Sequence, residues 1–204
     1  MNKILADMHT HTIASGHAYA TLTEMCKEAA NKGLEIYGIT EHSSGTPGTC
    51  ADIYFQNLRV VPRDLFGLDL RLGAEINIID YNGTLDLDQK YIDRLDFVIA
   101  GIHSVCYKFG SKEENTAAII NAIKNPNVNI ISHPDDGRCP LDYEALVQAA
   151  KEYHVLLEIN NNALRDKNRK NVKENQKLII ENCKKYNPIA KVTGQILRLV
   201  APLM

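Results

Sequence analysis

Short apolar segments rich in β-branched residues alternate six times with segments of helical periodicity, and this alternation limits the possible folds most strongly. The predicted strands lie near residues 4–11, 36–40, 71–79, 97–102, 129–132 and 155–159. The predicted helices lie near residues 21–32, 86–95, 112–124, 142–153 and 171–186. Residues 53–67 are predicted to be irregular or briefly helical. Such a succession predicts parallel strands joined by crossover helices, in a barrel or in an open sheet.

Six of the seven histidines lie at or just after the carboxyl end of a predicted strand. His9 and His11 occupy alternate positions, which share one face of an extended strand. In a closed parallel barrel all these strand ends meet on one rim, where the active sites of such barrels are built. The histidines therefore favour a barrel with one site on that rim. The six are His9, His11, His17, His42, His103 and His133.

Glu75 stands in the middle of an apolar strand. A buried carboxylate is costly unless it is paired or bound to metal, so Glu75 is interpreted as a bridging metal ligand or as half of a buried ion pair. His154 ends a predicted helix, where a cation suits the helix dipole, and is interpreted as structural. Because zinc usually takes four ligands, this ligand set implies two or three ions.

The composition limits which classes of protein this chain can belong to. The 204 residues are 45% hydrophobic, enough for one core, and the net charge of −2 gives no case for a nucleic-acid or membrane partner. The N-terminus shows no secretory signal and no apolar run approaches the length of a membrane span, so a cytoplasmic location is expected. The five cysteines are scattered and read as reduced thiols, with Cys106 and Cys139 near strand ends.

Seven short motifs, in order, are similar to those of the PHP (polymerase and histidinol phosphatase) family, and most closely to its short bacterial phosphatase branch. They are Asp7-Met8-His9-Thr10-His11-Thr12, Ser15-Gly16-His17-Ala18, Thr40-Glu41-His42, Gly73-Ala74-Glu75, Gly101-Ile102-His103-Ser104, Ile131-Ser132-His133-Pro134 and Leu157-Glu158-Ile159-Asn160-Asn161. The resemblance covers about residues 7–187. It implies an α/β fold, a distorted (β/α)7 TIM-like barrel that is incomplete at the seventh strand, with a trinuclear metal site.

The resemblance also implies a ligand set. His9, His11 and Glu75 would hold a first ion, His17 and His42 a second, and Glu75, His103 and His133 a third. His9, His11, Glu75, His103 and His133 would be the catalytic residues. Zinc is the expected metal, with manganese or iron as alternatives. Asp7 would orient a ligand imidazole.

Three basic residues follow predicted strand ends and are candidates for binding a phosphate group: Lys108, Arg138 and Arg165. The alternative for each is an ordinary solvated loop charge.

The C-terminal part departs from the family. Family members close the barrel with a seventh strand carrying a Gly-Ser-Asp-Ala-His type motif, whose Asp and His complete the first and second metal sites. Here that strand would begin at residues 188–190, and no Asp or Glu follows Glu181 and no His follows His154. We therefore expect a metal-binding barrel domain at residues 1–190 and an atypical tail at 191–204. A frameshift, a truncation, a degenerate copy and natural divergence are the explanations for this tail.

The resemblance implies a metal-dependent phosphatase that hydrolyses small phosphomonoesters with water activated on the metal cluster. Three alternatives stay open: a metal-binding but catalytically impaired PHP fragment, a polymerase-associated PHP phosphoesterase, and a metal-dependent amidohydrolase. The expected partner is a small phosphate ester, and a homo-oligomer is left open.

Overall fold

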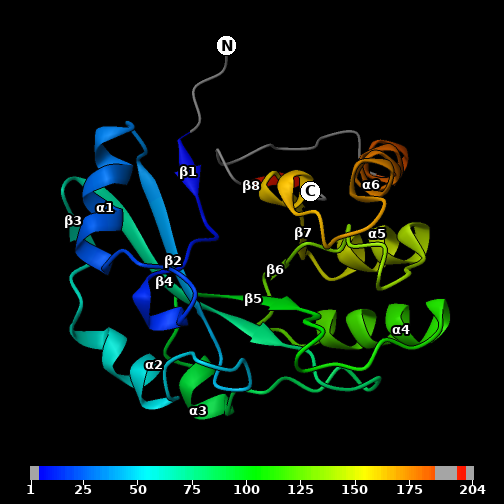
Figure 1. The fold of residues 1–204 in the computed structure, drawn as a ribbon, viewed down its shortest axis with the longest axis horizontal. Coiled ribbons are helices and arrows are strands. Elements are labelled where there is room, and N and C mark those ends of the chain that lie inside the picture. Colours follow the sequence, from blue (N-terminus) through cyan, green and yellow to red (C-terminus); the bar gives the residue numbers. More distant parts are fainter. Residues whose placement is uncertain (1–4, 187–196, 201–204) are drawn as a thin grey trace.

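The computed structural model describes residues 5–186 and 197–200, which form one sheet with helices packed against it (Figure 1). The strands pair in the order β1-β2-β4-β5-β6-β7-β8, and β3 pairs with β4 beside this path. The strands are β1 (Ala6–Asp7), β2 (Ile36–His42), β3 (Asp64–Leu65), β4 (Leu68–Asn77), β5 (Phe97–Gly101), β6 (Ile130–Ile131), β7 (Leu156–Asn160) and β8 (Leu197–Val200).

The six strands predicted from the sequence are β1, β2, β4, β5, β6 and β7, and neighbours among them pair in parallel. They form a curled half-barrel, and within the described residues the sheet does not close. The predicted α/β barrel with an incomplete end is thus confirmed. β8 pairs antiparallel with β7, whereas the strand expected at 188–190 lies outside the described residues.

The helices follow the predicted boundaries at most places. They are η1 (Ile13–Ser15), α1 (Leu22–Asn31), α2 (Ile53–Asn57), η2 (Leu58–Val60), α3 (Gln89–Ile92), α4 (Lys112–Ile123), α5 (Tyr143–Glu152), η3 (Asn162–Arg165) and α6 (Val172–Tyr186). Thr21 and Glu24 form the predicted capping box of α1, and the Asp142 side chain accepts two N–H groups at the start of α5. No helix within the described ranges is both long enough and apolar enough to span a bilayer.

One predicted helix is much shorter than expected. Residues 86–95 hold only the single turn α3, because the chain after β4 turns back and forms an antiparallel bridge between Ile78 and Leu85. The Asp86 carboxylate then accepts hydrogen bonds from the Asn77 backbone at 2.9 Å and from the Asn77 side chain at 2.6 Å. These contacts hold residues 77–86 under the site and leave fewer residues for a helix.

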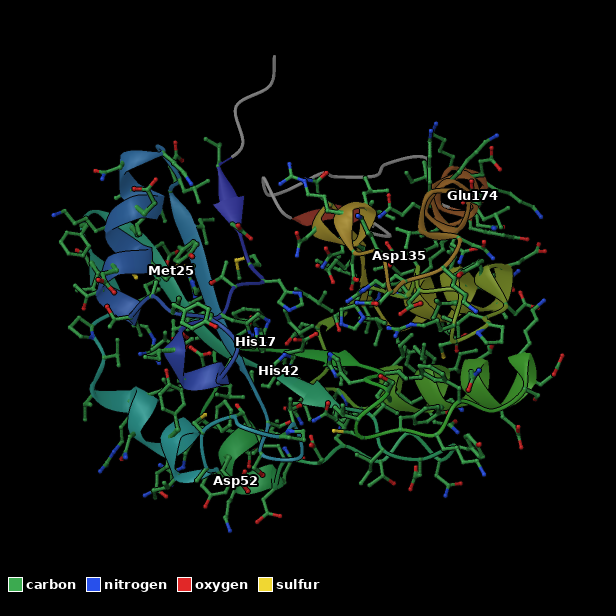
Figure 2. All side chains as sticks on the ribbon, viewed as in Figure 1. His17, Met25, His42, Asp52, Asp135 and Glu174 are labelled. Atoms are coloured by element: carbon green, nitrogen blue, oxygen red, sulfur yellow. The ribbon has the colours of Figure 1, made fainter. Side chains whose placement is uncertain are left out.

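The register of the sheet decides which residues share its inner face. His42 lies beside Glu75, Glu75 beside Ile99, and Ile99 beside Ile130. Ile99 and Ile130 form a small apolar cluster with Phe97, separate from the main core under the helices. Glu75 therefore sits on the inner face above this cluster, and Figure 2 places His17 and His42 near the middle of the molecule.

Candidate metal centre

A polar cavity of about 370 Å³ opens at the carboxyl ends of the strands, as the barrel interpretation predicts. Six histidines from four different strand ends reach it, and Glu75 reaches it from a fifth strand, β4. His154 is not among its lining residues. The lining residues are His9, His11, His17, His42, Glu75, His103, His133, Asn160, Asn162 and Arg169. The structure thus brings together all seven residues predicted as metal ligands.

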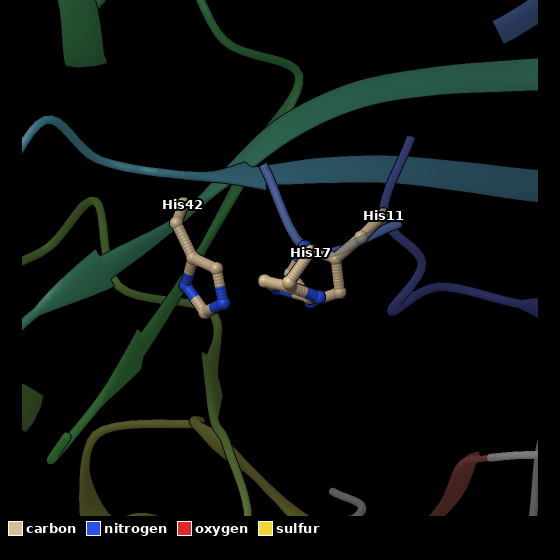
Figure 3. Close-up of side chains that lie close together, drawn as sticks. All are labelled: His11, His17 and His42. Carbon is tan, nitrogen blue, oxygen red and sulfur yellow. The ribbon is translucent and has the colours of Figure 1, made fainter. Parts of the chain in front are cut away.

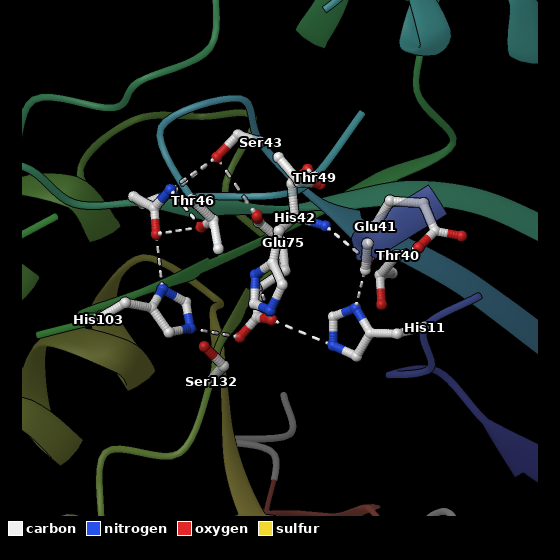
Figure 4. A network of polar contacts seen from close by, with 12 residues as sticks. His11, Thr40, Glu41, His42, Ser43, Thr46, Thr49, Glu75, His103 and Ser132 are labelled. Atoms are coloured by element: carbon white, nitrogen blue, oxygen red, sulfur yellow. Dashed lines mark hydrogen bonds and ion pairs between the residues drawn. The ribbon is translucent and has the colours of Figure 1, made fainter. Parts of the chain in front are cut away.

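Glu75 is the centre of this cluster. Its side chain is 1% exposed, and each of its oxygens faces a different group of imidazoles. The distances from Oε2 are 3.0 Å to His9 Nε2, 3.3 Å to His11 Nε2 and 3.2 Å to His42 Nδ1. The distances from Oε1 are 3.1 Å to His133 Nε2 and 3.3 Å to His103 Nε2. Figure 4 shows Glu75 between His11 and His103.

Hydrogen bonds to outer residues decide which nitrogen of two imidazoles carries the proton. His9 Nδ1 lies 3.1 Å from Glu158 Oε1, and His103 Nδ1 lies 2.7 Å from Asn77 Oδ1. Because these oxygens only accept, Nδ1 donates in both cases. Both Nε2 atoms then face the centre, as in metal-binding histidines.

The Ser15 hydroxyl holds the proton of His11 on Nδ1 in the same way. Ser15 donates its one hydroxyl proton to Glu41, so its oxygen accepts from His11 Nδ1 at 3.0 Å. The His11 Nε2 lone pair therefore also faces Glu75. Glu41 is fully buried and was not predicted from the sequence, although it lies in the Thr40-Glu41-His42 motif.

Several imidazole nitrogens of the cluster lie close to one another. His9 Nε2 lies 3.2 Å from His11 Nε2, and His103 Nε2 lies 3.1 Å from His133 Nε2. His42 Nδ1 is buried and lacks a hydrogen-bond partner within the described part of the chain. Imidazole nitrogens this close need a proton or a metal cation between them, and imidazole with carboxylate is a donor set suited to zinc.

Three subsets have one ligand atom each within 4.8 Å of the others. They are His9–His11–Glu75, His42–Glu75–His103 and His11–His17–His42. Figure 3 shows the last of these, whose rings lie 4.5 to 5.0 Å apart. The residues present therefore fit a metal ion and offer more than one set of ligands for it.

Burial and the close carboxylates shift the pKa values in this cluster. Burial opposes charge on His9, but Glu75 and Glu158 on either side raise its pKa well above the ordinary value. Burial also opposes charge on Glu75, yet the surrounding imidazoles hold its pKa well below the usual range. Burial lowers the pKa of His42 to about 3. Positive charge is thus favoured beside Glu75, which a metal would supply in place of a proton.

Asp7 does not contact an imidazole. It accepts a hydrogen bond from the His9 backbone N–H at 3.4 Å, and burial raises its pKa to about 6. Glu158, in β7, holds the His9 ring instead and also accepts the His133 backbone N–H at 2.7 Å. The sequence analysis assigned Glu158 no role. Glu158 is nevertheless a carboxylate in an apolar strand, which is the feature that identified Glu75 as a candidate.

The three basic candidates do not line the cavity. Lys108 and Arg165 are exposed, and Arg138 forms an ion pair with Asp136 at 2.6 Å. Arg169 lines the cavity instead, from the segment before α6. Cys106 and Cys139 are free thiols outside the cavity lining.

Comparison with known proteins agrees with this geometry. A family model of the PHP domain matches residues 7–186. A probable phosphatase of Acetivibrio thermocellus is 46% identical over 183 residues, 90% of this chain and 75% of the relative. A probable phosphatase of Caldicellulosiruptor saccharolyticus is 50% identical over 182 residues, 88% of this chain and 74% of the relative.

One solved structure shares the fold. It is the histidinol phosphate phosphatase of Lactococcus lactis, in complex with zinc, L-histidinol and phosphate. It superposes with a TM-score of 0.54 at 17% identity, over 89% of this chain and 80% of that one. By the family match and the sequence identity of its relatives, this chain belongs to the PHP domain family.

Proposed function

We propose that this protein is a metal-dependent phosphatase that hydrolyses small phosphomonoesters with two or three metal ions. The observation that carries the proposal is the set of five imidazoles around Glu75, three of which present Nε2 because outer residues hold Nδ1–H. The proposed ligands are His9, His11, His17, His42, Glu75, His103 and His133. Zinc is the first choice, with manganese or iron as alternatives.

Metal ions in such a cluster lower the pKa of water and neutralise charge on a phosphoryl group. The protein contributes the arrangement around them. Glu75 would bridge the two halves of the cluster, and its side chain is almost completely buried. Outer residues fix the rings of His9, His11 and His103, which reduces the entropy lost when a metal binds.

The names of the relatives support this proposal. Two relatives that match most of this chain are called probable phosphatases. The structural neighbour acts on a phosphate monoester and is described with zinc. The proposal includes residues 1–190 as a metal-binding barrel domain with an atypical tail at 191–204, and no nucleic-acid partner. It also includes a cytoplasmic location, which the five free cysteines support.

The test is turnover of p-nitrophenyl phosphate by the protein loaded with zinc, manganese or iron, with metal content from elemental analysis. His103→Ala and His133→Ala should lose metal and turnover together. His154→Ala is the matched control, since His154 lies outside the cavity, and should keep both. Metal retained equally in all three variants would contradict the ligand assignment. Metal bound without turnover in the unmutated protein would favour the catalytically impaired alternative.

A further inference from the structure

Arg169 is the cationic side chain among the residues that line the cavity, and the mechanism above does not use it. It precedes α6, and its side chain is 18% exposed. Asn160 and Asn162, from the end of β7 and from η3, line the same cavity. The cavity therefore carries a guanidinium and two amides in addition to the imidazole cluster.

Carboxylates hold the Arg169 guanidinium in place, but they do not use all of its N–H groups. Arg169 Nε lies 3.5 Å from Asp166 Oδ2, and Nη1 lies 3.9 Å from Asp135 Oδ1. Both Nη1 and Asp135 Oδ1 are buried atoms without a hydrogen-bond partner among the described residues. Gln176 donates to the other Asp135 oxygen at 2.6 Å and so fixes that carboxylate. Asp135 thus orients Arg169 by charge and leaves guanidinium N–H groups available to a ligand.

The position of this arginine is electrostatically unusual. Asp135 lies two residues after His133, which contacts Glu75 at 3.1 Å, so Arg169 stands close to the cluster that would bind divalent cations. Positive groups facing one cavity repel one another, and an anion between them removes the repulsion. A guanidinium also matches the geometry of phosphate oxygens.

We infer that Arg169, oriented by Asp135, forms an anion subsite that binds the phosphate group of the substrate and of the inorganic phosphate product. This inference rests on the proposed function and names the group that the site recognises. The amide of Asn162, which lines the same cavity, extends the subsite.

The test measures binding of inorganic phosphate to the metal-loaded full chain by calorimetry, together with KM and kcat for p-nitrophenyl phosphate. Arg169→Gln should weaken phosphate binding about 10- to 100-fold and raise KM similarly, because one charge-assisted contact is lost. Arg169→Lys should recover part of the affinity, since it keeps the charge without the planar fork. Metal content and Tm should stay unchanged in both variants.

Lys167→Gln is the matched control, because Lys167 is an exposed cation in the same segment. It should bind phosphate like the unmutated protein. Phosphate affinity within twofold in Arg169→Gln, or loss of metal in both Arg169 variants, would overturn the subsite. Turnover without dependence on Arg169 would refute the subsite alone. Phosphate binding that depends on Arg169 without any turnover would refute the proposed function alone.

Discussion

Glu158→Gln should weaken metal binding without unfolding the protein. Glu158 is fully buried and accepts three hydrogen bonds, from His9 Nδ1 at 3.1 Å, from Asn160 Nδ2 at 2.8 Å and from the His133 backbone N–H at 2.7 Å. Glutamine has the same shape but replaces one acceptor oxygen with an NH₂ group. Either orientation of that amide places a donor against at least one of these donors.

The magnitude follows from these contacts. Leaving a buried donor unsatisfied costs about 1 to 3 kcal/mol, and losing a hydrogen bond to a charged acceptor costs about as much. The His9 ring then loses the contact that keeps its proton on Nδ1, and the His133 backbone, at φ +30°, loses the contact that holds this uncommon conformation. We expect zinc affinity to fall about 10- to 100-fold, as for other residues that orient metal ligands.

The assay is competition for zinc against a chelator of known affinity, with thermal unfolding measured on the same samples. Glu181→Gln is the matched control, because Glu181 is an exposed side chain on α6 whose 3.8 Å pair with Lys177 contributes little. Zinc affinity of Glu158→Gln within twofold of the Glu181→Gln value would refute the orienting role of Glu158.

Three further outcomes are expected. Because Glu75 and Glu158 raise the pKa of His9 against the effect of burial, zinc binding at pH 7 should release a proton. The measured binding enthalpy should then vary with the ionisation enthalpy of the buffer. A binding enthalpy that is independent of the buffer would contradict this. Burial raises the pKa of Asp135 to about 6, so the stability tied to its protonated form is present below pH 3.8 and is lost as pH rises through 6. In denaturant unfolding, the free energy of unfolding of Asp135→Asn should therefore rise relative to that of the unmutated protein between pH 4 and 7, by about 3 kcal/mol at most. A difference between the two proteins that stays constant with pH would contradict this. A Cβ at Gly101 would lie 2.1 Å from Ser132 Oγ and 3.4 Å from the His103 ring. Gly101→Ala should therefore lower the free energy of unfolding by about 1 to 3 kcal/mol in denaturant unfolding and reduce the zinc content in elemental analysis. A variant as stable and as zinc-rich as the parent would argue against this packing.

Local patterns in the chain were enough to predict much of this architecture. Alternating apolar runs and capped helices predicted the six parallel strands, because strand and helix periodicities depend on neighbouring residues alone. The capping box at Thr21 and the cap at Asp142 were confirmed for the same reason. α3 was overestimated, because the bridge between Ile78 and Leu85 joins residues whose pairing no local pattern reveals.

The residues of the candidate site divide in the same way. The sequence predicted that the histidines at strand ends and Glu75 lie together, since a parallel sheet brings the carboxyl ends of its strands to one edge. Glu158 and Arg169 were missed, and Arg138 and Arg165 were chosen in place of Arg169. Loop arginines look alike in sequence, and only the tertiary structure pairs Arg138 with Asp136 and brings Arg169 to the cavity. Periodicity is a local property of the chain, whereas the distance between a loop side chain and a distant strand depends on how the whole sheet curls.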